Sequence, residues 1–206
     1  MTQQKDSIKA MQEKNAEAMK SQIKRLAQGR RASDNRVYIK TAEAKNVLLR
    51  GLVYFLGEET QWLPEYDAVA EWLSDNQGRG LLCLGNCGRG KTVITQQILP
   101  LIFQHWHGLV QNNYTALDLC DKFEEVRQWK IICIDDVGTE PLANKYGEKH
   151  EYLSELVDDA ERKGKLIIIS TNLNAKELRE RYGERVADRL RKLTTQVVFK
   201  GKSLRK

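Results

Sequence analysis

Eight consecutive residues, 85–92, match the phosphate-binding loop pattern G-x-x-x-x-G-K-[ST] at each fixed position. The glycines of such a loop let backbone N–H groups close around phosphate oxygens, because no Cβ stands in the way. The lysine is expected to reach the β- and γ-phosphates, and the threonine hydroxyl to bind Mg²⁺. The run therefore predicts a binding site for ATP and Mg²⁺. Its residues are Gly85, Asn86, Cys87, Gly88, Arg89, Gly90, Lys91 and Thr92.

A second group of chemically active residues lies 44 positions after Lys91, where an apolar run ends in Asp135 and Asp136. Ligands of open α/β sheets bind at the carboxyl ends of the strands, so this pattern places two carboxylates beside the phosphates. Asp135 is expected to hold Mg²⁺, directly or through water. Asp136 is expected to orient and polarise the attacking water as a general base.

A polar residue, Asn172, follows a third apolar run, residues 166–169. An amide at that place can reach the γ-phosphate, or the water held by Asp136. The other interpretation is structural: Asn174 caps the helix that follows, and Glu177 completes a capping box. Because the two asparagines occupy different positions, both interpretations can hold.

Segment 181–191 carries four arginines. Arginine beside a transferring phosphate stabilises the charge that develops in the transition state, and a neighbouring subunit can supply it. The competing interpretation is a solvated basic helix, which is the commoner role of such a segment. The residue types alone do not choose among these arginines.

The elements that must position these residues alternate between strand and helix. Continuous apolar runs such as 131–134 are typical of strands buried on both faces, hence of a parallel sheet covered by helices. Pro100 predicts a kink or an early end in the helix after the phosphate loop. The predicted strands are 80–84, 114–117, 130–135, 165–171 and 195–199, and the predicted helices are 91–106, 118–127, 148–163, 174–182 and 184–192.

These elements predict an α/β fold, a three-layer P-loop NTPase with a mostly parallel five-stranded sheet. The expected domain organisation has three parts. Residues 1–35 form a basic helical arm and linker, residues 36–79 a helical lead-in, and residues 80–206 the ATPase core. The arm is expected to be helical over residues 3–29, and the lead-in over 41–57 and 66–76.

The net charge of +6 is unevenly distributed along the 206 residues. Residues 1–50 carry a net charge of +7, residues 189–206 also carry +7, and the segment between them carries −8. Basic ends on an acidic body suggest a polyanionic partner, and single-stranded DNA is the expected one. The alternative is that the basic residues at both ends are simply exposed to solvent and keep the protein soluble.

Cysteine spacing and hydropathy exclude several classes of protein. The four cysteines include no C-x-x-C pair, so neither a zinc site nor a disulfide framework is expected. No apolar run approaches the roughly 18 residues that a membrane span needs, and the charged N-terminus does not have the pattern of a signal peptide. These features predict a cytoplasmic protein with reduced thiols and no membrane contact.

The chain resembles the AAA+ ATPases of the DnaC-type bacterial helicase loaders and the related IstB-type transposition helpers. The resemblance covers residues 66–200, and its last two motifs are the most distinctive. The motifs are GNCGRGKT (85–92), IDDVGTEP (134–141), STNLNAKEL (170–178) and YGERVADRL (182–190).

The resemblance implies that Asn172 is the sensor asparagine and that Arg189 completes a neighbouring subunit's site as an arginine finger, with Arg185 as a second candidate. It implies an ATP-hydrolysing oligomer that places a replicative helicase on single-stranded DNA. It also implies a core without a C-terminal helical lid, because the chain ends 17 residues after Arg189.

Two other functions remain open. One is a transposition helper that handles target DNA beside a transposase. The other is a nucleotide-gated DNA-binding adaptor with incidental turnover, since Asp136 in place of a glutamate is compatible with slow hydrolysis. A small-molecule kinase is disfavoured by the paired carboxylates of Asp135 and Asp136.

Overall fold

A computed structural model of the chain describes residues 35–140, 144–145, 148–149 and 152–204. The chain divides into two units, Met1–Asn35 and Arg36–Lys206. The helix predicted over residues 3–29 lies outside the described residues. Within the described part, no helix is both long and apolar enough to cross a membrane.

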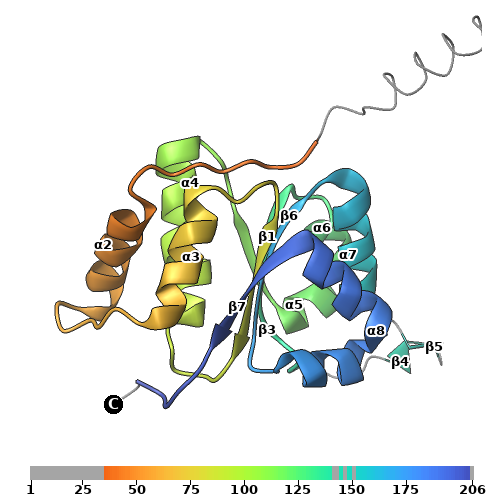
Figure 1. Cartoon of the computed structure of the whole chain (residues 1–206). Coiled ribbons are helices and arrows are strands. Elements are labelled where there is room, and N and C mark those ends of the chain that lie inside the picture. The colour runs from red at the N-terminus through yellow and green to blue at the C-terminus, as the bar shows by residue number, and fades with distance from the viewer. Residues whose placement is uncertain (1–34, 141–143, 146–147, 150–151, 205–206) are drawn as a thin grey trace, which may run out of the picture. The chain divides into compact units, whose positions relative to one another are not determined.

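Five parallel strands form the central sheet of the second unit, in the order β2-β3-β6-β1-β7. Because all five run in the same direction, their carboxyl ends meet at one edge, the lower edge in Figure 1. The five predicted strands are confirmed, but the second lies two residues earlier than the predicted 114–117, because residues 116 and 117 begin a helix that Thr115 caps. The strands are β1 (Gly80–Gly85), β2 (Asn112–Thr115), β3 (Ile131–Val137), β6 (Leu166–Thr171) and β7 (Thr194–Phe199).

Helices cover both faces of the sheet, which confirms the three-layer α/β fold (Figure 1). One layer contains α2 (Ala44–Leu56), α3 (Pro64–Ser74), the π-helical segment η1 (Val93–Ile98) and α4 (Leu99–His107). The other contains α5 (Ala116–Asp121), α6 (Phe123–Val126), α7 (Tyr152–Lys163) and α8 (Ala175–Leu193).

A short antiparallel pair, β4 (Asn144–Lys145) and β5 (Glu148–Lys149), precedes α7. The sequence had predicted a helix from residue 148, and this part of the prediction is wrong. Residues 148–149 pair with 144–145 across a two-residue connection, so their backbone is extended, and the helix begins at Tyr152.

Alternating side chains of the strands build two apolar clusters, one on each face of the sheet. Leu81 of β1 packs into the cluster under α2, α3 and α4, whereas its neighbour Leu82 packs into the cluster under α5 to α8. Leu48 of α2 and Tyr66 of α3 belong to the first cluster. The lead-in helices therefore share a core with the sheet.

The helix after the phosphate loop runs through Pro100 instead of ending there, and its irregularity lies just before the proline, in η1. Pro100 has no N–H to give to the carbonyl of Gln96. Asn113 Nδ2 donates to that carbonyl at 3.0 Å, and Gln111 Nε2 donates to the Thr95 carbonyl at 2.6 Å. Side chains at the start of β2 thus satisfy carbonyls at the irregular turn, so the predicted early end is not needed.

Candidate functional site

The phosphate loop connects the carboxyl end of β1 to η1. Gly90 adopts φ of 85°, a conformation that favours glycine. Two residues of α3 hold the loop in place. Tyr66 Oη donates to the Arg89 carbonyl at 3.1 Å, and Glu65 forms a 2.6 Å ion pair with the Arg89 guanidinium.

The Glu65 and Arg89 side chains are only 6% and 10% exposed, so this ion pair is nearly buried. The sequence had placed Arg89 in the nucleotide site. Its side chain points into α3 and is not part of the cavity lining described below. Only the Arg89 backbone is available to a nucleotide in this arrangement.

Lys91 lies against the loop and is 5% exposed. Its Nζ donates to the carbonyls of Gly85 at 2.6 Å and Asn86 at 2.8 Å. It also donates to Asn172 Oδ1 at 3.0 Å, which joins the loop to the end of β6. Burial lowers the pKa of the Lys91 ammonium, and nearby acidic groups, including Asp136, act in the opposite direction.

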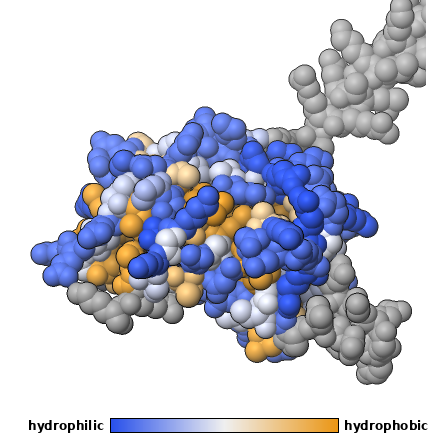
Figure 2. Space-filling view, turned by 60° about the horizontal axis from the view of Figure 1, so that its bottom comes forward, coloured by the Kyte–Doolittle hydropathy of each residue, from blue (hydrophilic) through white to orange (hydrophobic). Residues whose placement is uncertain are grey.

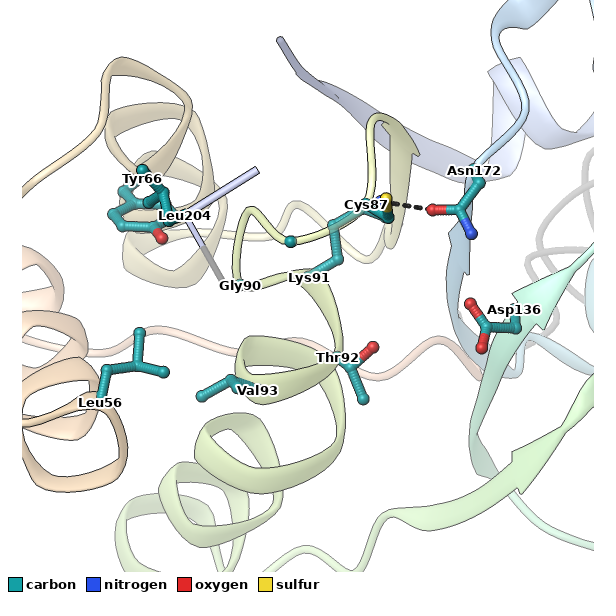
Figure 3. A pocket seen from close by; sticks show the side chains of 11 residues that line it. Leu56, Tyr66, Cys87, Gly90, Lys91, Thr92, Val93, Asp136, Asn172 and Leu204 are labelled. Atoms are coloured by element: carbon teal, nitrogen blue, oxygen red, sulfur yellow. Dashed lines mark hydrogen bonds between the residues drawn. The ribbon is translucent and has the colours of Figure 1, made fainter. Parts of the chain in front are cut away.

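A cavity of about 330 Å³ opens beside the loop, at the carboxyl edge of the sheet. Figure 3 shows Thr92, Asp136 and Asn172 around one part of it, with Lys91 extending from the loop toward Asn172. The structure therefore brings together the predicted lysine, threonine, general base and sensor asparagine. The lining residues are Leu56, Tyr66, Cys87, Gly88, Gly90, Lys91, Thr92, Val93, Asp136, Asn172 and Leu204.

A bulge at the end of β3 gives the two aspartates different environments. In a regular strand, neighbouring side chains point to opposite faces of the sheet, but the pairing of β3 with β6 shifts register between Ile134 and Val137. Asp136 has φ of 54° and is exposed at the cavity, whereas Asp135 is 5% exposed. The Asp136 carbonyl accepts from the Thr139 hydroxyl at 2.8 Å, which secures this strained turn.

The donor set fits Mg²⁺. The ion prefers oxygen ligands and is usually bound through one or two carboxylates together with substrate phosphates and water. Asp135 offers a nearly buried carboxylate that accepts a hydrogen bond from the Ser170 hydroxyl, and Thr92 offers a hydroxyl at the cavity. Among the residues that the structure describes, no cluster of three or more His, Cys, Asp or Glu could hold a metal by itself.

The capping interpretation of Asn174 is confirmed, and Asn172 lies at the cavity, where its predicted role requires it to be. Asn172 meets Lys91 at the cavity, whereas Asn174 caps α8 by accepting from the backbone of Lys176 at 2.9 Å and Glu177 at 3.0 Å. The Glu177 side chain accepts from the Asn174 N–H at 2.8 Å, which completes the predicted capping box.

The two finger candidates do not line the cavity of their own chain. Both lie on α8, after a kink at Gly183, where the sequence had predicted a break between two helices. Arg189 forms ion pairs with Asp158 and, at 3.3 Å, with Glu161 of α7. Arg185 contacts Asp158 at 3.1 Å.

Two positioning residues escaped the sequence analysis. Ser170, fully buried on β6, donates to Asp135, and its place in the motif STNLNAKEL was the only signal for it. Glu140 joins the turn after Asp136 to α8, because it accepts from the Gly138 N–H at 2.8 Å and from the Tyr182 hydroxyl. Glu140 directly precedes Pro141 in the sequence, and that position gave no indication of this contact.

Comparison with known proteins identifies the fold. No protein-family model matches the sequence, and no curated protein sequence matches it significantly. The crystal structure of the DnaC helicase loader superposes with a TM-score of 0.52 at 21% identity, covering 78% of this chain and 93% of that one. This chain has the fold of the DnaC helicase loader.

Two further structures share the fold at lower identity. The crystal structure of DnaI matches with a TM-score of 0.50 and 13% identity, over 80% of this chain and 86% of that one. AMPPCP-bound DnaA from Aquifex aeolicus matches with a TM-score of 0.50 and 14% identity, over 68% of this chain and 49% of that one. The resemblance to DnaC-type proteins that the motifs suggested is thus confirmed at the level of the fold.

Proposed function

We propose that this chain binds and hydrolyses ATP with Mg²⁺ at a site completed by a second subunit, and that it loads or remodels a replicative DNA helicase on single-stranded DNA in the cytoplasm. One observation carries the proposal. Lys91, Thr92, Asp136 and Asn172 line a single cavity of about 330 Å³, whereas Arg189 lies outside it.

The polar residues at the cavity have distinct proposed roles. The Lys91 ammonium, held between two loop carbonyls and Asn172, carries positive charge toward the β- and γ-phosphates. The exposed Asp136 carboxylate accepts a proton from the attacking water, and the Asn172 amide orients that water or the γ-phosphate. Thr92 and Asp135 would hold Mg²⁺, which would supply positive charge to neutralise the phosphates.

The placement of the arginines supports a shared site. Arg189 is 27% exposed and is held by two carboxylates of α7, so its direction is fixed within its own subunit. An arginine finger is worth about 10³–10⁵ in kcat where it acts. Lys91 is the one lysine or arginine among the residues that line the cavity, so a neighbouring copy that brings Arg189 there would supply a second positive charge.

The proposed partners follow from the fold and the charge distribution. DnaC is a helicase loader, and one DnaA structure of the same fold, with a TM-score of 0.50 and 17% identity, is bound to AMPPCP and single-stranded DNA. The net charge of +7 on residues 189–206 supports contact with a polyanion.

The test is ATP hydrolysis by mixtures of two inactive variants, Lys91→Ala and Arg189→Ala. If two subunits share the site, each variant alone is inactive. Their mixture regains activity, because interfaces with an intact loop from one chain and an intact finger from the other form again. Arg191→Ala is the matched control, since this arginine lies on the same helix, is 56% exposed and pairs only with Asp188 among the contacts described.

Activity of Arg189→Ala equal to that of the wild type would remove the shared site from the proposal. Single-stranded DNA and the helicase are then added to the wild type and to Asp136→Asn. Helicase loading that survives in Asp136→Asn, with hydrolysis abolished, would favour the nucleotide-gated adaptor over the ATP-driven loader.

A further inference from the structure

The segment after β7 crosses the phosphate loop. We call residues 201–204 the C-terminal strap. Asn86 Nδ2 donates to the Gly201 carbonyl at 2.8 Å, and the Leu204 N–H donates to the Gly88 carbonyl at 2.9 Å. The strap is therefore hydrogen-bonded to two positions of the loop that is expected to hold the phosphates.

The contact between strap and loop is close. A Cβ added to Gly88 would lie 2.8 Å from Cβ of Ser203, so only glycine allows this approach. Arg89 Nη1 donates to the Lys202 carbonyl at 3.4 Å. The strap thus contacts the loop and its buried ion pair, and Leu204 is the strap residue that lines the cavity.

The cavity has a polar end and an apolar end. Figure 3 shows Asp136, Asn172 and Thr92 on one side, and Leu56, Tyr66, Val93 and Leu204 on the other. Figure 2 turns this edge of the molecule toward the viewer and shows hydrophobic residues across the middle of the face, with hydrophilic residues around them. The polar end suits a triphosphate, and the apolar end suits a planar ring.

Two leucines at the apolar end are far from fully packed. Leu204 of the strap is 51% exposed, and Leu56 at the end of α2 is 47% exposed. Both line the cavity although they are separated by most of the chain. A flat apolar ligand between them would remove this surface from water, which is a favourable contribution to binding.

We propose that the C-terminal strap forms the binding subsite for the base of the nucleotide, with Leu204 and Leu56 as its apolar contacts. This inference rests on the proposed nucleotide site and adds the base subsite to it. The ligand class is the base of a nucleoside triphosphate. The strap is hydrogen-bonded to Asn86 and Gly88, so binding of the base at the strap is expected to affect how the loop closes around the phosphates.

The experiment compares two ligands, ATP and inorganic tripolyphosphate, for the wild type, Leu204→Asp and Leu204→Met, by isothermal titration calorimetry with Mg²⁺. Leu204→Asp is expected to weaken ATP about five- to tenfold, since about half of a leucine side chain is at stake. Tripolyphosphate has no base, so only the repulsion by the new carboxylate acts on it, and Leu204→Asp is expected to weaken it less than ATP. Leu204→Met keeps an apolar side chain and is expected to restore ATP affinity.

Leu117→Asp is the matched control, because Leu117 is 54% exposed on α5 and does not line the cavity. Equal weakening of ATP and tripolyphosphate in Leu204→Asp would overturn the inference, since the strap would then act on the phosphate loop alone. Unchanged ATP affinity in Leu204→Asp would overturn it as well. Failure of the wild type to bind either ligand would instead overturn the proposed function.

Discussion

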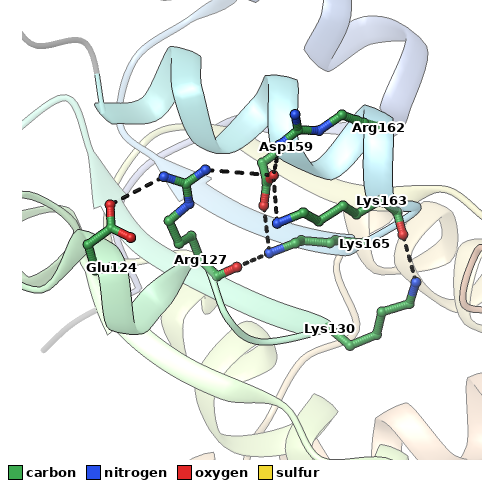
Figure 4. A network of polar contacts seen from close by, with 7 residues as sticks. All are labelled: Glu124, Arg127, Lys130, Asp159, Arg162, Lys163 and Lys165. Atoms are coloured by element: carbon green, nitrogen blue, oxygen red, sulfur yellow. Dashed lines mark hydrogen bonds and ion pairs between the residues drawn. The ribbon is translucent and has the colours of Figure 1, made fainter.

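Asp159 of α7 is the centre of a charged network whose removal should destabilise the fold strongly (Figure 4). Its side chain is 2% exposed. It lies within ion-pair distance of Arg162 at 2.7 Å, Lys163 at 2.9 Å, Lys165 at 2.9 Å and Arg127 at 3.9 Å. Four cations around one nearly buried carboxylate make this residue difficult to replace.

The substitution Asp159→Asn keeps the shape of the side chain and removes its charge. Lys165 is 3% exposed, so its ammonium stays in the interior with the Arg127 carbonyl as its remaining acceptor among the contacts described. Removing one partner of a buried ion pair costs about 3–5 kcal/mol. Arg162 and Lys163 are 70% and 49% exposed, so losing their contacts adds at most about 1 kcal/mol each.

Urea unfolding at pH 7, followed by tryptophan fluorescence, measures the change, because Trp72 is 2% exposed in the core. With an m-value of about 2 kcal/mol/M, the expected total loss of about 3–7 kcal/mol lowers the urea midpoint by about 1.5–3.5 M. Asp188→Asn is the control, since its ion pair with Arg191 is 56–68% exposed and its loss should change stability by about 0.5 kcal/mol or less.

The pH dependence gives an independent check. Burial alone would raise the pKa of Asp159, but the hydrogen bonds from Lys165, Arg162 and Lys163 outweigh it and lower the pKa. A lowered pKa contributes stability that is present above the unfolded value of about 3.9 and is lost as pH falls through the folded value. The difference between wild type and variant should stay constant from pH 8 to about 5 and shrink below about pH 4. A loss under about 1 kcal/mol at pH 7, or a difference that persists unchanged at pH 3, would refute this reasoning.

Two further substitutions or reactions test the site. Ser170→Ala removes the hydroxyl that donates to Asp135, so the Mg²⁺ concentration for half-maximal hydrolysis should rise about 10- to 100-fold. Ser154→Ala on α7 is the control. An unchanged Mg²⁺ requirement in Ser170→Ala would contradict the positioning role of Ser170. Iodoacetamide at pH 8 should modify the exposed Cys87 before Cys83, because burial raises the pKa of the Cys83 thiol to about 12. ATP with Mg²⁺ should slow the reaction at Cys87, because Cys87 lines the cavity. Equal rates at the two thiols, or no protection by the nucleotide, would show that the cavity is placed wrongly.

The strands and the main site residues could be predicted because their signals are local. Continuous apolar runs indicated the buried strands, and the glycine pattern of residues 85–92 indicated the turn between β1 and η1. The Asn174 cap is also a local signal, since its capping-box partner Glu177 lies only three residues further along the chain. These features depend on residues close in sequence.

Contacts between distant segments could not be read in the same way. Nothing local in the sequence pairs Glu65 with Arg89, or brings Leu204 to the cavity, since each depends on how whole elements pack. The bulge that turns Asp136 toward the cavity likewise arises from the register between β3 and β6. The kink or early end predicted at Pro100 considered only the lost N–H, whereas the structure supplies side-chain donors nearby.

The order of the strands explains why residues of these separate motifs contact one another at one edge of the sheet. β6 lies between β1 and β3, so residues at its end reach both neighbours. Asn172 contacts Lys91 on the β1 side, and Ser170 contacts Asp135 on the β3 side. Adjacent strands lie about 4.8 Å apart. With β3 beside β1, Asn172 would be about one strand spacing too far from Lys91 for a direct hydrogen bond, so the proposed sensor role depends on this insertion as much as on the asparagine.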